Sequence, residues 1–191
     1  MQSIDNLTRH EIVSDESEAL ILVDAQDNEI GSLDKSSCHD GSGVLHRAFS
    51  LFIFNAAGEL LLQKRGEDKR LWPGYWSNSC CSHPRVGETM ADAVQRRCAQ
   101  ELGFSTNLQL IYKFEYSAQF EDLGSEHELC WVYVGQHDGA LDVNGAEISE
   151  VQWLAPDVLD NELQTNASSY TPWFKLEWDR LRTEFADQLP F

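Results

Sequence analysis

The strongest constraint on the fold is a run of 13 residues, LQLIYKFEYSAQF at positions 108–120, in which apolar and polar side chains alternate over many positions. Successive side chains of a β-strand point to opposite faces of its sheet, so a half-buried strand alternates in this way. A second β-rich run, CWVYVG, follows at positions 130–135. Together the two runs predict a mixed or antiparallel sheet.

Three further segments have strand composition, and they lie in the first third of the chain at residues 19–24, 48–54 and 60–63. The sequence NAAG at 55–58 joins the last two. Its asparagine and glycine are typical of a tight connection between paired strands, so it predicts a hairpin turn.

Helical patterns are fewer. In GETMADAVQRRCAQELGF, which begins at Gly87, apolar residues recur at helical spacing, acids occupy the first turns and Gly103 provides a stop. A short helix is expected after Pro156 and an amphipathic one over residues 173–185. The predicted class is α/β, with strands outnumbering the flanking helices and a sheet that is mixed or antiparallel.

The length of 191 residues suits one domain with a substantial core. We expect that domain over residues 18–191, after a polar lead-in at residues 1–17 whose composition is typical of disorder.

No stretch has the length of a transmembrane helix, and the N-terminus lacks the layout of a signal peptide. Five cysteines without CxxC spacing favour reduced thiols. The sequence therefore predicts a cytoplasmic protein.

The net charge of -18 argues against nucleic acid or an anionic membrane as a partner. The charge is unevenly distributed. Residues 35–97 hold nine of the 14 Lys and Arg residues and only six acids, so this window is +3 while the remainder is -21. A solvated surface is the ordinary explanation for any single basic residue, but one region of the chain can hold an anion.

Two carboxylates, Glu126 and Glu128, precede the second β-rich run with His127 between them. On a strand this spacing places both acids on one face and the histidine on the other. Two carboxylates this close together need a cation between them, or a raised pKa on one of them. The alternative is that both acids are simply exposed to solvent at a strand end. Three upstream histidines would complete a five-ligand shell for Mn, Mg, Zn or Fe: His39, His46 and His83.

From Ser82 onward the spacing follows the box of Nudix hydrolases, Gly-x5-Glu-x7-Arg-Glu-U-x-Glu-Glu-x-Gly-U with U aliphatic, but the chemistry differs. Two positions that carry metal-binding glutamates in that box are Arg97 and Gln100 here, and only Glu101 is kept. Multi-metal pyrophosphate hydrolysis would lack its ligands. A surface ion pair between Arg97 and Glu101 is the plainer interpretation, whereas a Nudix-like fold with another reaction explains both the frame and the changes.

Seven stretches join these features in order along the chain: LHRAFSLFIFN, LLLQKR, LWPGYWSNSCCSHP, the helix ending in QELG, FEYSA, EHELC and TPWF. In this combination the sequence resembles type I isopentenyl diphosphate isomerases from about residue 33 to residue 173. The resemblance implies a Nudix-like β-sheet sandwich. It also implies reversible conversion of isopentenyl diphosphate to dimethylallyl diphosphate by a 1,3-proton shift, a step of isoprenoid biosynthesis.

The resemblance also implies roles for individual residues. Cys81 and Glu128 match a catalytic cysteine and glutamate on opposite faces of the alkene, and Tyr116 matches a tyrosine beside the glutamate. Glu101 and the backbone carbonyl of Cys81 match the site of a Mg²⁺ ion that accompanies the diphosphate. The first metal site, expected to hold Mn²⁺ or Mg²⁺ with Zn²⁺ as an alternative, is matched by His39, His46, His83, Glu126 and Glu128.

Residues of the basic window match those that hold or surround the diphosphate in the family: Lys35, Arg65, Lys69, Ser82 and Arg97. Trp173 matches an aromatic side chain over the hydrocarbon. Because the surface is acidic overall, we expect binding to depend on Mg²⁺ and on this local positive charge rather than on long-range attraction.

The implied reaction has clear physical requirements. Protonating the double bond creates a tertiary carbocation, which must be shielded from water and stabilised by negative charge or an aromatic face. Trp72, Trp76 and Trp173 are candidate walls. An acid and a base are needed on opposite sides of the alkene, and Cys81 and Glu128 can fill these roles in either order.

The alternative for Cys81 is a buried small hydrophobe, which is what we expect of three other cysteines: Cys80, Cys98 and Cys130.

Two other functions stay open at this point. One is a Nudix-type diphosphate hydrolase, which would release phosphate. The other is an inactive module that binds a metal or a diphosphate, and the presence of both Cys81 and Glu128 argues against it. A monomer or a homodimer is expected.

Overall fold

The computed structural model describes residues 12–190 of the chain. Nine strands within these residues form one mixed sheet, one of the two arrangements that the alternating patterns predict. The disorder expected for the N-terminal lead-in falls largely on residues 1–11, which lie outside the described residues. A bilayer-spanning helix is absent from the part of the chain that the structure describes.

The central strand is β3 (His46–Phe54), which pairs in parallel along its whole length with β8 (Gly124–Gln136). β8 in turn pairs antiparallel with β7 (Leu108–Phe120) in a long hairpin. The other edge of β3 is shared. It meets β1 (Ala19–Val23) near its start, β6 (Cys80–Ser82) in its middle and β4 (Leu60–Arg65) at its end.

The remaining strands extend this arrangement. β2 (Glu29–Asp34) pairs with β1 and is followed at once by the short helix α1 (Lys35–Cys38). β4 is flanked by β5 (Trp76–Ser77) and β9 (Ile148–Leu154). The mixed sheet follows from the parallel pairing of β3 with β8.

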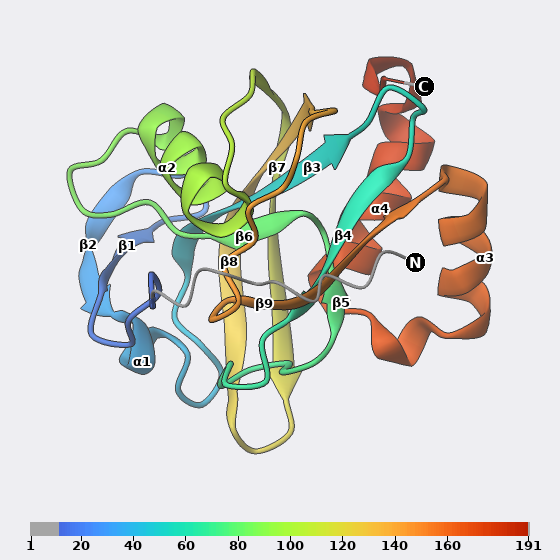
Figure 1. Cartoon of the computed structure of the whole chain (residues 1–191). Coiled ribbons are helices and arrows are strands. Elements are labelled where there is room, and N and C mark those ends of the chain that lie inside the picture. The colour runs from blue at the N-terminus through green and yellow to red at the C-terminus, as the bar shows by residue number, and fades with distance from the viewer. Residues whose placement is uncertain (1–11, 191) are drawn as a thin grey trace.

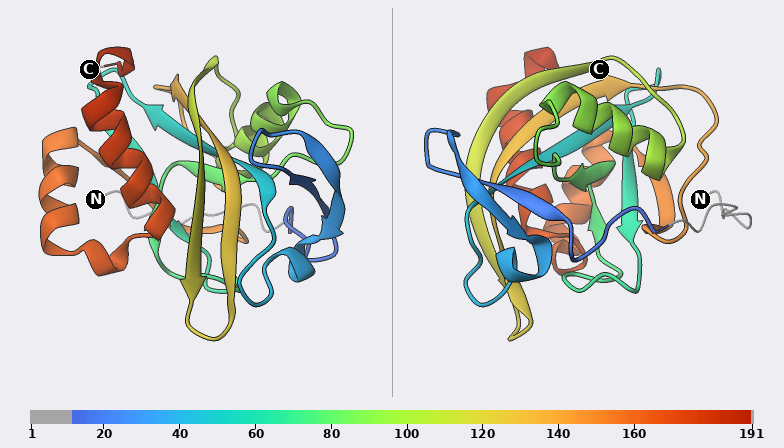
Figure 2. Two further views of the ribbon diagram at one scale, coloured as in Figure 1. Left: turned by 180° about the vertical axis from the view of Figure 1, so that it is seen from behind. Right: turned by 90° about the vertical axis from the view of Figure 1, so that its left-hand side faces the viewer.

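Helices cover both faces of the central strands (Figure 1), with α2 (Met90–Leu102) on one face and α3 (Pro156–Thr165) and α4 (Pro172–Glu184) on the other (Figure 2). Short 3-10 turns follow α3 and α4 at Ala167–Ser169 and Ala186–Gln188. Side chains of β3 alternate between two cores. Phe49 and Leu51 pack in the core beneath α2, while Phe52 and Phe54 pack in the core beneath α4. Burial of both faces explains why residues 51–54 of this strand are all apolar.

The ends of α2 follow local chemistry. Thr89 caps the first turn by accepting a hydrogen bond from the backbone of Asp92 at 3.2 Å. Gly103 ends the helix with a φ of 82°, a conformation that favours glycine. An added Cβ there would lie 2.4 Å from the Cβ of Asp142, so a side chain would also clash. The predicted stop at Gly103 is confirmed.

Most predicted elements are present, but several bounds differ. β7 has the predicted limits, whereas β8 begins at Gly124 and therefore includes the EHE sequence. The turn at 55–58 is confirmed by a hydrogen bond from Gly58 N to Asn55 O, yet the strands it joins pair only at Phe54 and Leu60. The segments β2, β5, β6 and β9 are strands that the sequence patterns did not predict.

Candidate active site

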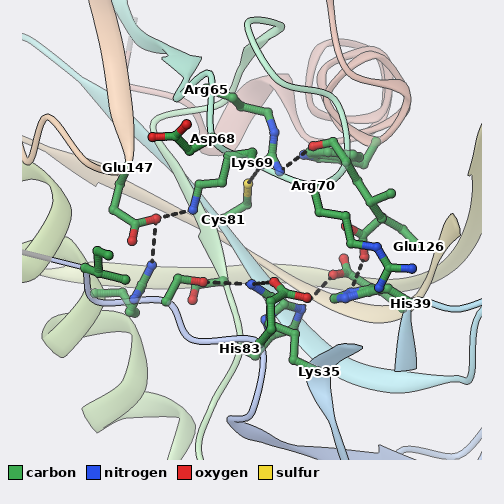
Figure 3. Close-up of a pocket in the computed structure, with 18 of the residues that line it drawn as sticks. Lys35, His39, Arg65, Asp68, Lys69, Arg70, Cys81, His83, Glu126 and Glu147 are labelled. Carbon is green, nitrogen blue, oxygen red and sulfur yellow. Dashed lines mark hydrogen bonds and ion pairs between the residues drawn. The ribbon is translucent and has the colours of Figure 1, made fainter. Parts of the chain in front are cut away.

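A cavity of about 240 Å³ brings together side chains from both halves of the chain. Its wall includes α1, the end of β4 with the loop after it, β6, α2, the β7–β8 hairpin and the first turn of α4. Figure 3 shows these side chains converging from separate elements. Of the residues that the resemblance singles out, all but His46 and Glu101 line this cavity.

Three histidines and two glutamates converge at one side of the cavity. His39 Nε2 lies 2.9 Å from Glu126 Oε2, and His83 Nε2 lies 3.1 Å from Glu128 Oε1. His46 Nε2 is 3.2 Å from His83 Nε2 and 3.7 Å from Glu128 Oε1. Ligand atoms from four of these residues lie within 4.8 Å of one another, and this buried group can hold a metal ion.

The hydrogen bonding of the cluster also fits a divalent ion. His46 Nδ1 donates to Val44 O at 2.7 Å, which leaves the lone pair of Nε2 directed at the cluster. His39 Nε2 and Glu126 Oε2 are buried and face each other, yet neither makes a hydrogen bond of acceptable geometry within residues 12–190. Imidazole nitrogens and carboxylate oxygens suit Mn, Fe and Zn. A shared cation would satisfy both of these atoms.

The two acids of the EHE sequence lie on one face of β8 and the histidine lies on the other, as predicted. Glu126 and Glu128 are buried, while His127 points away and bonds Glu115 at 3.0 Å. The alternative of two exposed acids at a strand end is wrong, since both lie inside β8.

Protonation states in the cluster follow from burial and from close partners. Burial lowers the pKa of His83 to about 4, so its ring is neutral at pH 7 and can act as a ligand. Burial raises the pKa of Glu128, but the nearby rings of His46 and His83 outweigh it and hold that pKa well below its usual range. Glu128 is therefore a carboxylate.

Glu128 has a second partner on the neighbouring strand. The Tyr116 hydroxyl donates a hydrogen bond of 2.6 Å to Glu128 Oε2, from a position directly opposite in the β7–β8 register. Burial raises the pKa of Tyr116 well above its usual value, and the Glu128 charge adds to this effect. Tyr116 thus stays protonated and fixes the orientation of the carboxylate.

Cys81 lies across β3 from Glu128, because β6 and β8 pair with opposite edges of that strand. Its Sγ is 3.7 Å from Arg65 Nη1, a donor that favours the thiolate. Burial nevertheless raises the pKa of Cys81 to about 12. The resting group is a thiol, which holds a proton beside the cavity. Cys80 points the other way into the core beneath α2, as predicted.

Basic side chains from the window 35–97 form a cationic wall on one side of the cavity. Arg65, Lys69 and Arg97 line the cavity together with Lys35 and Ser82. Arg65 is held by the backbone carbonyls of Leu71 and Trp72. Five polar side chains, from four elements and the loop after β4, thus surround a space that suits an anion.

The plainer interpretation of Arg97 and Glu101 as a surface pair is wrong. Arg97 is 2% exposed and Glu101 3% exposed, and Arg97 Nε donates to Glu101 Oε1 at 2.9 Å. Glu101 lies behind Arg97 and does not itself line the cavity. Breaking a buried pair of this kind leaves an uncompensated charge, so it matters far more than a surface pair would.

Aromatic side chains close another part of the cavity. Trp173, in the first turn of α4, lines it, and Arg65 lies 5.2 Å from the centre of its ring. Trp72 packs edge-on behind Trp173 at 5.2 Å between ring centres. Trp76, the third expected wall, packs against the core without lining the cavity.

Several residues near the cavity were not found from the sequence. Glu147 lies between Lys69 and Arg97 and precedes β9. The end of the N-terminal lead-in also lines the cavity through Ile12, Ser14 and Glu16. Glu177 is fully buried in α4 near Cys130, which donates to it at 3.4 Å. The alternating ISEVQWL at 148–154 was an available sign of the strand that follows Glu147.

The chain matches a known domain family and named relatives. A family model described as the NUDIX domain matches residues 44–174. The Isopentenyl-diphosphate Delta-isomerase 1 of Photorhabdus laumondii is 41% identical over 174 residues, which cover 90% of this chain and 99% of that protein. The Isopentenyl-diphosphate Delta-isomerase of Burkholderia multivorans is 42% identical over 157 residues, covering 82% and 89%. That of Serratia proteamaculans is 45% identical over 157 residues, covering 82% and 87%.

Solved structures share the fold at lower identity. The DR0079 protein of Deinococcus radiodurans has a TM-score of 0.68 and 21% identity, over 83% of this chain and 96% of that one. The MutT protein of Methanosarcina mazei has a TM-score of 0.61 and 18% identity, over 74% and 95%. At these identities the likeness concerns the fold alone, and it confirms the predicted α/β sandwich.

Proposed function

The chain belongs to the type I isopentenyl-diphosphate Delta-isomerase family of the Nudix superfamily, and we propose that Cys81 and Glu128 carry out its two proton transfers. The enzyme interconverts isopentenyl diphosphate and dimethylallyl diphosphate. The observation that carries the proposal is the placement of a thiol and a carboxylate, from strands on the two sides of β3, in one cavity lined by cations.

The reaction moves a double bond by one position. One proton is added to the terminal methylene carbon of isopentenyl diphosphate, which leaves a tertiary cation, and another proton is removed from the carbon on the other side of that centre. A new double bond forms there and the proton count is unchanged. Because the reaction is reversible, the group that donates a proton in one direction accepts it in the other.

The surroundings of the two groups support these roles. Cys81 holds a proton in the resting state and lies beside Arg65, which would stabilise it after the proton has left. Glu128 is a carboxylate oriented by Tyr116, whose hydroxyl can pass a proton to or from it. Trp173 provides an aromatic face for the cationic centre.

We also assign a divalent ion, Mn²⁺ or Mg²⁺ with Zn²⁺ as the alternative, to the histidine cluster. Its proposed ligands are His39, His46, His83, Glu126 and Glu128. When bound, the ion would neutralise the two close carboxylates and tune the basicity of Glu128. Four of these proposed ligands are buried and His83 is partly buried, and each lies in a strand or directly after β6 or α1, which supports the assignment.

The diphosphate is assigned to the cationic wall. Lys35, Arg65, Lys69, Ser82 and Arg97 would hold its oxygens. A Mg²⁺ ion that accompanies the diphosphate is assigned to the backbone carbonyl of Cys81 and to Glu101, which pairs with Arg97 at the edge of the cavity wall. These residues bind and orient the substrate so that its hydrocarbon lies between Cys81, Glu128 and Trp173. The cytoplasmic location, the monomeric or homodimeric state and the lack of nucleic-acid and membrane partners stay predictions from the sequence.

The test compares two products. The purified protein is incubated with isopentenyl diphosphate, Mg²⁺ and Mn²⁺, and dimethylallyl diphosphate and free phosphate are measured together. We expect the isomer without phosphate release. Phosphate release from this or other diphosphates, with no isomer, would instead support the hydrolase alternative. Substrate binding without either product would support an inactive binding module.

A further inference from the structure

One carboxylate in the cationic wall has no part in the proton transfers or in the proposed metal sites. Glu147 is only 3% exposed and lines the cavity among the basic residues (Figure 3). A buried acid at an anion site is unexpected, because its charge opposes the charge of the ligand. Its contacts indicate what it does there.

Both carboxylate oxygens of Glu147 have partners. Oε2 forms an ion pair with Lys69 Nζ and lies 3.7 Å from Arg97 Nη2. Oε1 accepts a hydrogen bond of 3.3 Å from the backbone N–H of Val13, whose carbonyl in turn accepts one from Arg97. Glu147 therefore joins two cations of the wall to the segment that leads into β1.

The backbone at Glu147 is itself fixed on two sides. Its carbonyl accepts a 2.9 Å hydrogen bond from Gly66 N, at the end of β4, and its N–H donates to Asn144 O at 3.1 Å. Asn144 N donates to Glu101 O at 2.8 Å, which ties the same loop to α2. A Cβ added at Gly66 would lie 3.1 Å from Glu147 O, so the approach there is close. The carboxylate is held in place before any ligand arrives.

The charges around Lys69 indicate why a carboxylate lies beside it. Burial lowers the pKa of Lys69, and the neighbouring Arg65 lowers it further, whereas Glu147 and the more distant Glu101 raise it. Without Glu147 a desolvated ammonium would face another cation and would lose its proton more readily. A neutral or displaced Lys69 would be a poor partner for a diphosphate.

Arg97 has a similar dependence. It is shared between Glu101 and Glu147 in the resting structure. Glu101 is also the residue proposed for the Mg²⁺ that accompanies the diphosphate, so Glu147 is the partner of Arg97 that has no other assigned role. A guanidinium with a retained carboxylate neighbour keeps its orientation.

We propose that Glu147 is a positioning residue of the diphosphate site, which directs Lys69 and Arg97 into the cavity and preorganises them for the anion. The inference rests on the proposed function, since it concerns the same cavity. Preorganised groups bind a ligand more tightly because less ordering is left to be done on binding. A purely structural ion pair would instead affect folding stability without a selective effect on ligand binding.

The test uses the full chain and the variant Glu147→Gln, which keeps the shape of the side chain and removes its charge. The Kd of inorganic pyrophosphate with Mg²⁺ is measured by calorimetry, and KM and kcat are measured for isopentenyl diphosphate. We expect both Kd and KM to rise about tenfold, or about 1.4 kcal/mol, while kcat changes less than about threefold. Glu150→Gln is the matched control, because Glu150 pairs with Lys64 away from the cavity.

Two further variants guard the interpretation. Glu147→Asp keeps the charge but shortens its reach, and it replaces the glutamine variant if that one does not fold, with the same expected result. In a double-mutant cycle, Glu147→Gln should raise KM less in the Lys69→Met background than in the wild type, because its action through Lys69 is already lost and only its action through Arg97 is left. Additive effects would overturn the proposal.

The pH dependence gives an independent measurement. In Glu147→Gln the rise of KM at alkaline pH should begin at lower pH than in the wild type, since burial, Arg65 and the nearby Arg97 disfavour the charged form of Lys69 and Glu101 is left to offset them. Unchanged or tighter pyrophosphate binding with an unchanged KM would overturn the inference, even if stability fell. Absence of isomerase activity in the wild type would instead count against the proposed function, and the pyrophosphate measurement would still decide the role of Glu147.

Discussion

Cys81 and Glu128 face one cavity from strands that pair with opposite edges of β3. Ser50 of β3 is the register partner of Cys81, and His46 of β3 is the partner of Glu128, so one strand sets the spacing of both groups. Because the two groups lie on different strands, each can be replaced separately and its contribution to catalysis measured.

Replacing either group should abolish turnover with little effect on binding. We expect Cys81→Ala and Glu128→Gln each to lower kcat by about 10³-fold, the range found for general acid–base groups, with KM changed much less. Steady-state kinetics check this. Cys80→Ala is the control, since that neighbour packs in the opposite core, and it should retain most of the activity. An active Cys81→Ala variant would refute the assignment.

Loss of one cation from the anion wall should weaken substrate binding. Arg65→Gln and Lys69→Met are each expected to raise KM more than about tenfold, because a charge-assisted partner of the diphosphate is lost. Lys64→Met provides the comparison. That residue adjoins Arg65 but pairs with Glu150 outside the cavity, and its KM should match the wild type. Equal KM values for all three variants would contradict the diphosphate assignment.

The histidine cluster should be required for metal retention. In His39→Ala the tightly held divalent ion should be lost, as measured by elemental analysis after dialysis, and isomerase activity should fall with it. His127→Ala is matched to it, because His127 sits on β8 between two proposed ligands but points to the opposite face and bonds Glu115. Full metal content in His39→Ala would exclude the site.

Glu177 gives a prediction about stability. Burial raises the pKa of this carboxyl to about 8, although Cys130 and Ser50 offset part of the effect. Between its unfolded value of 4.5 and pH 8 the unfolded chain ionises at this residue while the folded protein keeps the proton, so the free energy of unfolding falls as pH rises.

A glutamine at this position binds no proton on folding, so Glu177→Gln removes this pH dependence while keeping the side-chain shape. The variant should therefore gain stability relative to the wild type as pH rises, on the order of 3 kcal/mol at pH 7. Urea unfolding at pH 5 and pH 8 measures the difference. A gap that is the same at both pH values would show that Glu177 is already ionised in the folded protein.

Local sequence patterns accounted for much of the fold. The 13-residue alternation at β7 and the glycine stop after α2 depend on period and backbone conformation, which neighbouring residues largely determine. The strand β6 is only three residues long, and its identity depends on β3 lying beside it. β2 is mostly exposed and has no apolar face to detect.

The site divides in a similar way. Cys81 was predicted from the family resemblance, and the histidines and the EHE acids from their residue types and spacing, because each lies in a short, distinctive stretch. Glu147 is separated by 78 residues from its partner Lys69, and the chain offers no local pattern that connects them. Burial of the Arg97–Glu101 pair likewise depends on the Glu147 loop and on Val13, which cover it from outside α2.

The most direct test of the central claim is proton NMR of isopentenyl diphosphate incubated with the enzyme, Mg²⁺ and Mn²⁺ in deuterated water. The proposed proton transfers predict dimethylallyl diphosphate that contains deuterium from the solvent, and no product with Cys81→Ala or Glu128→Gln. Unchanged substrate with the wild-type protein, or full activity in either variant, would contradict the claim that these two groups exchange the protons.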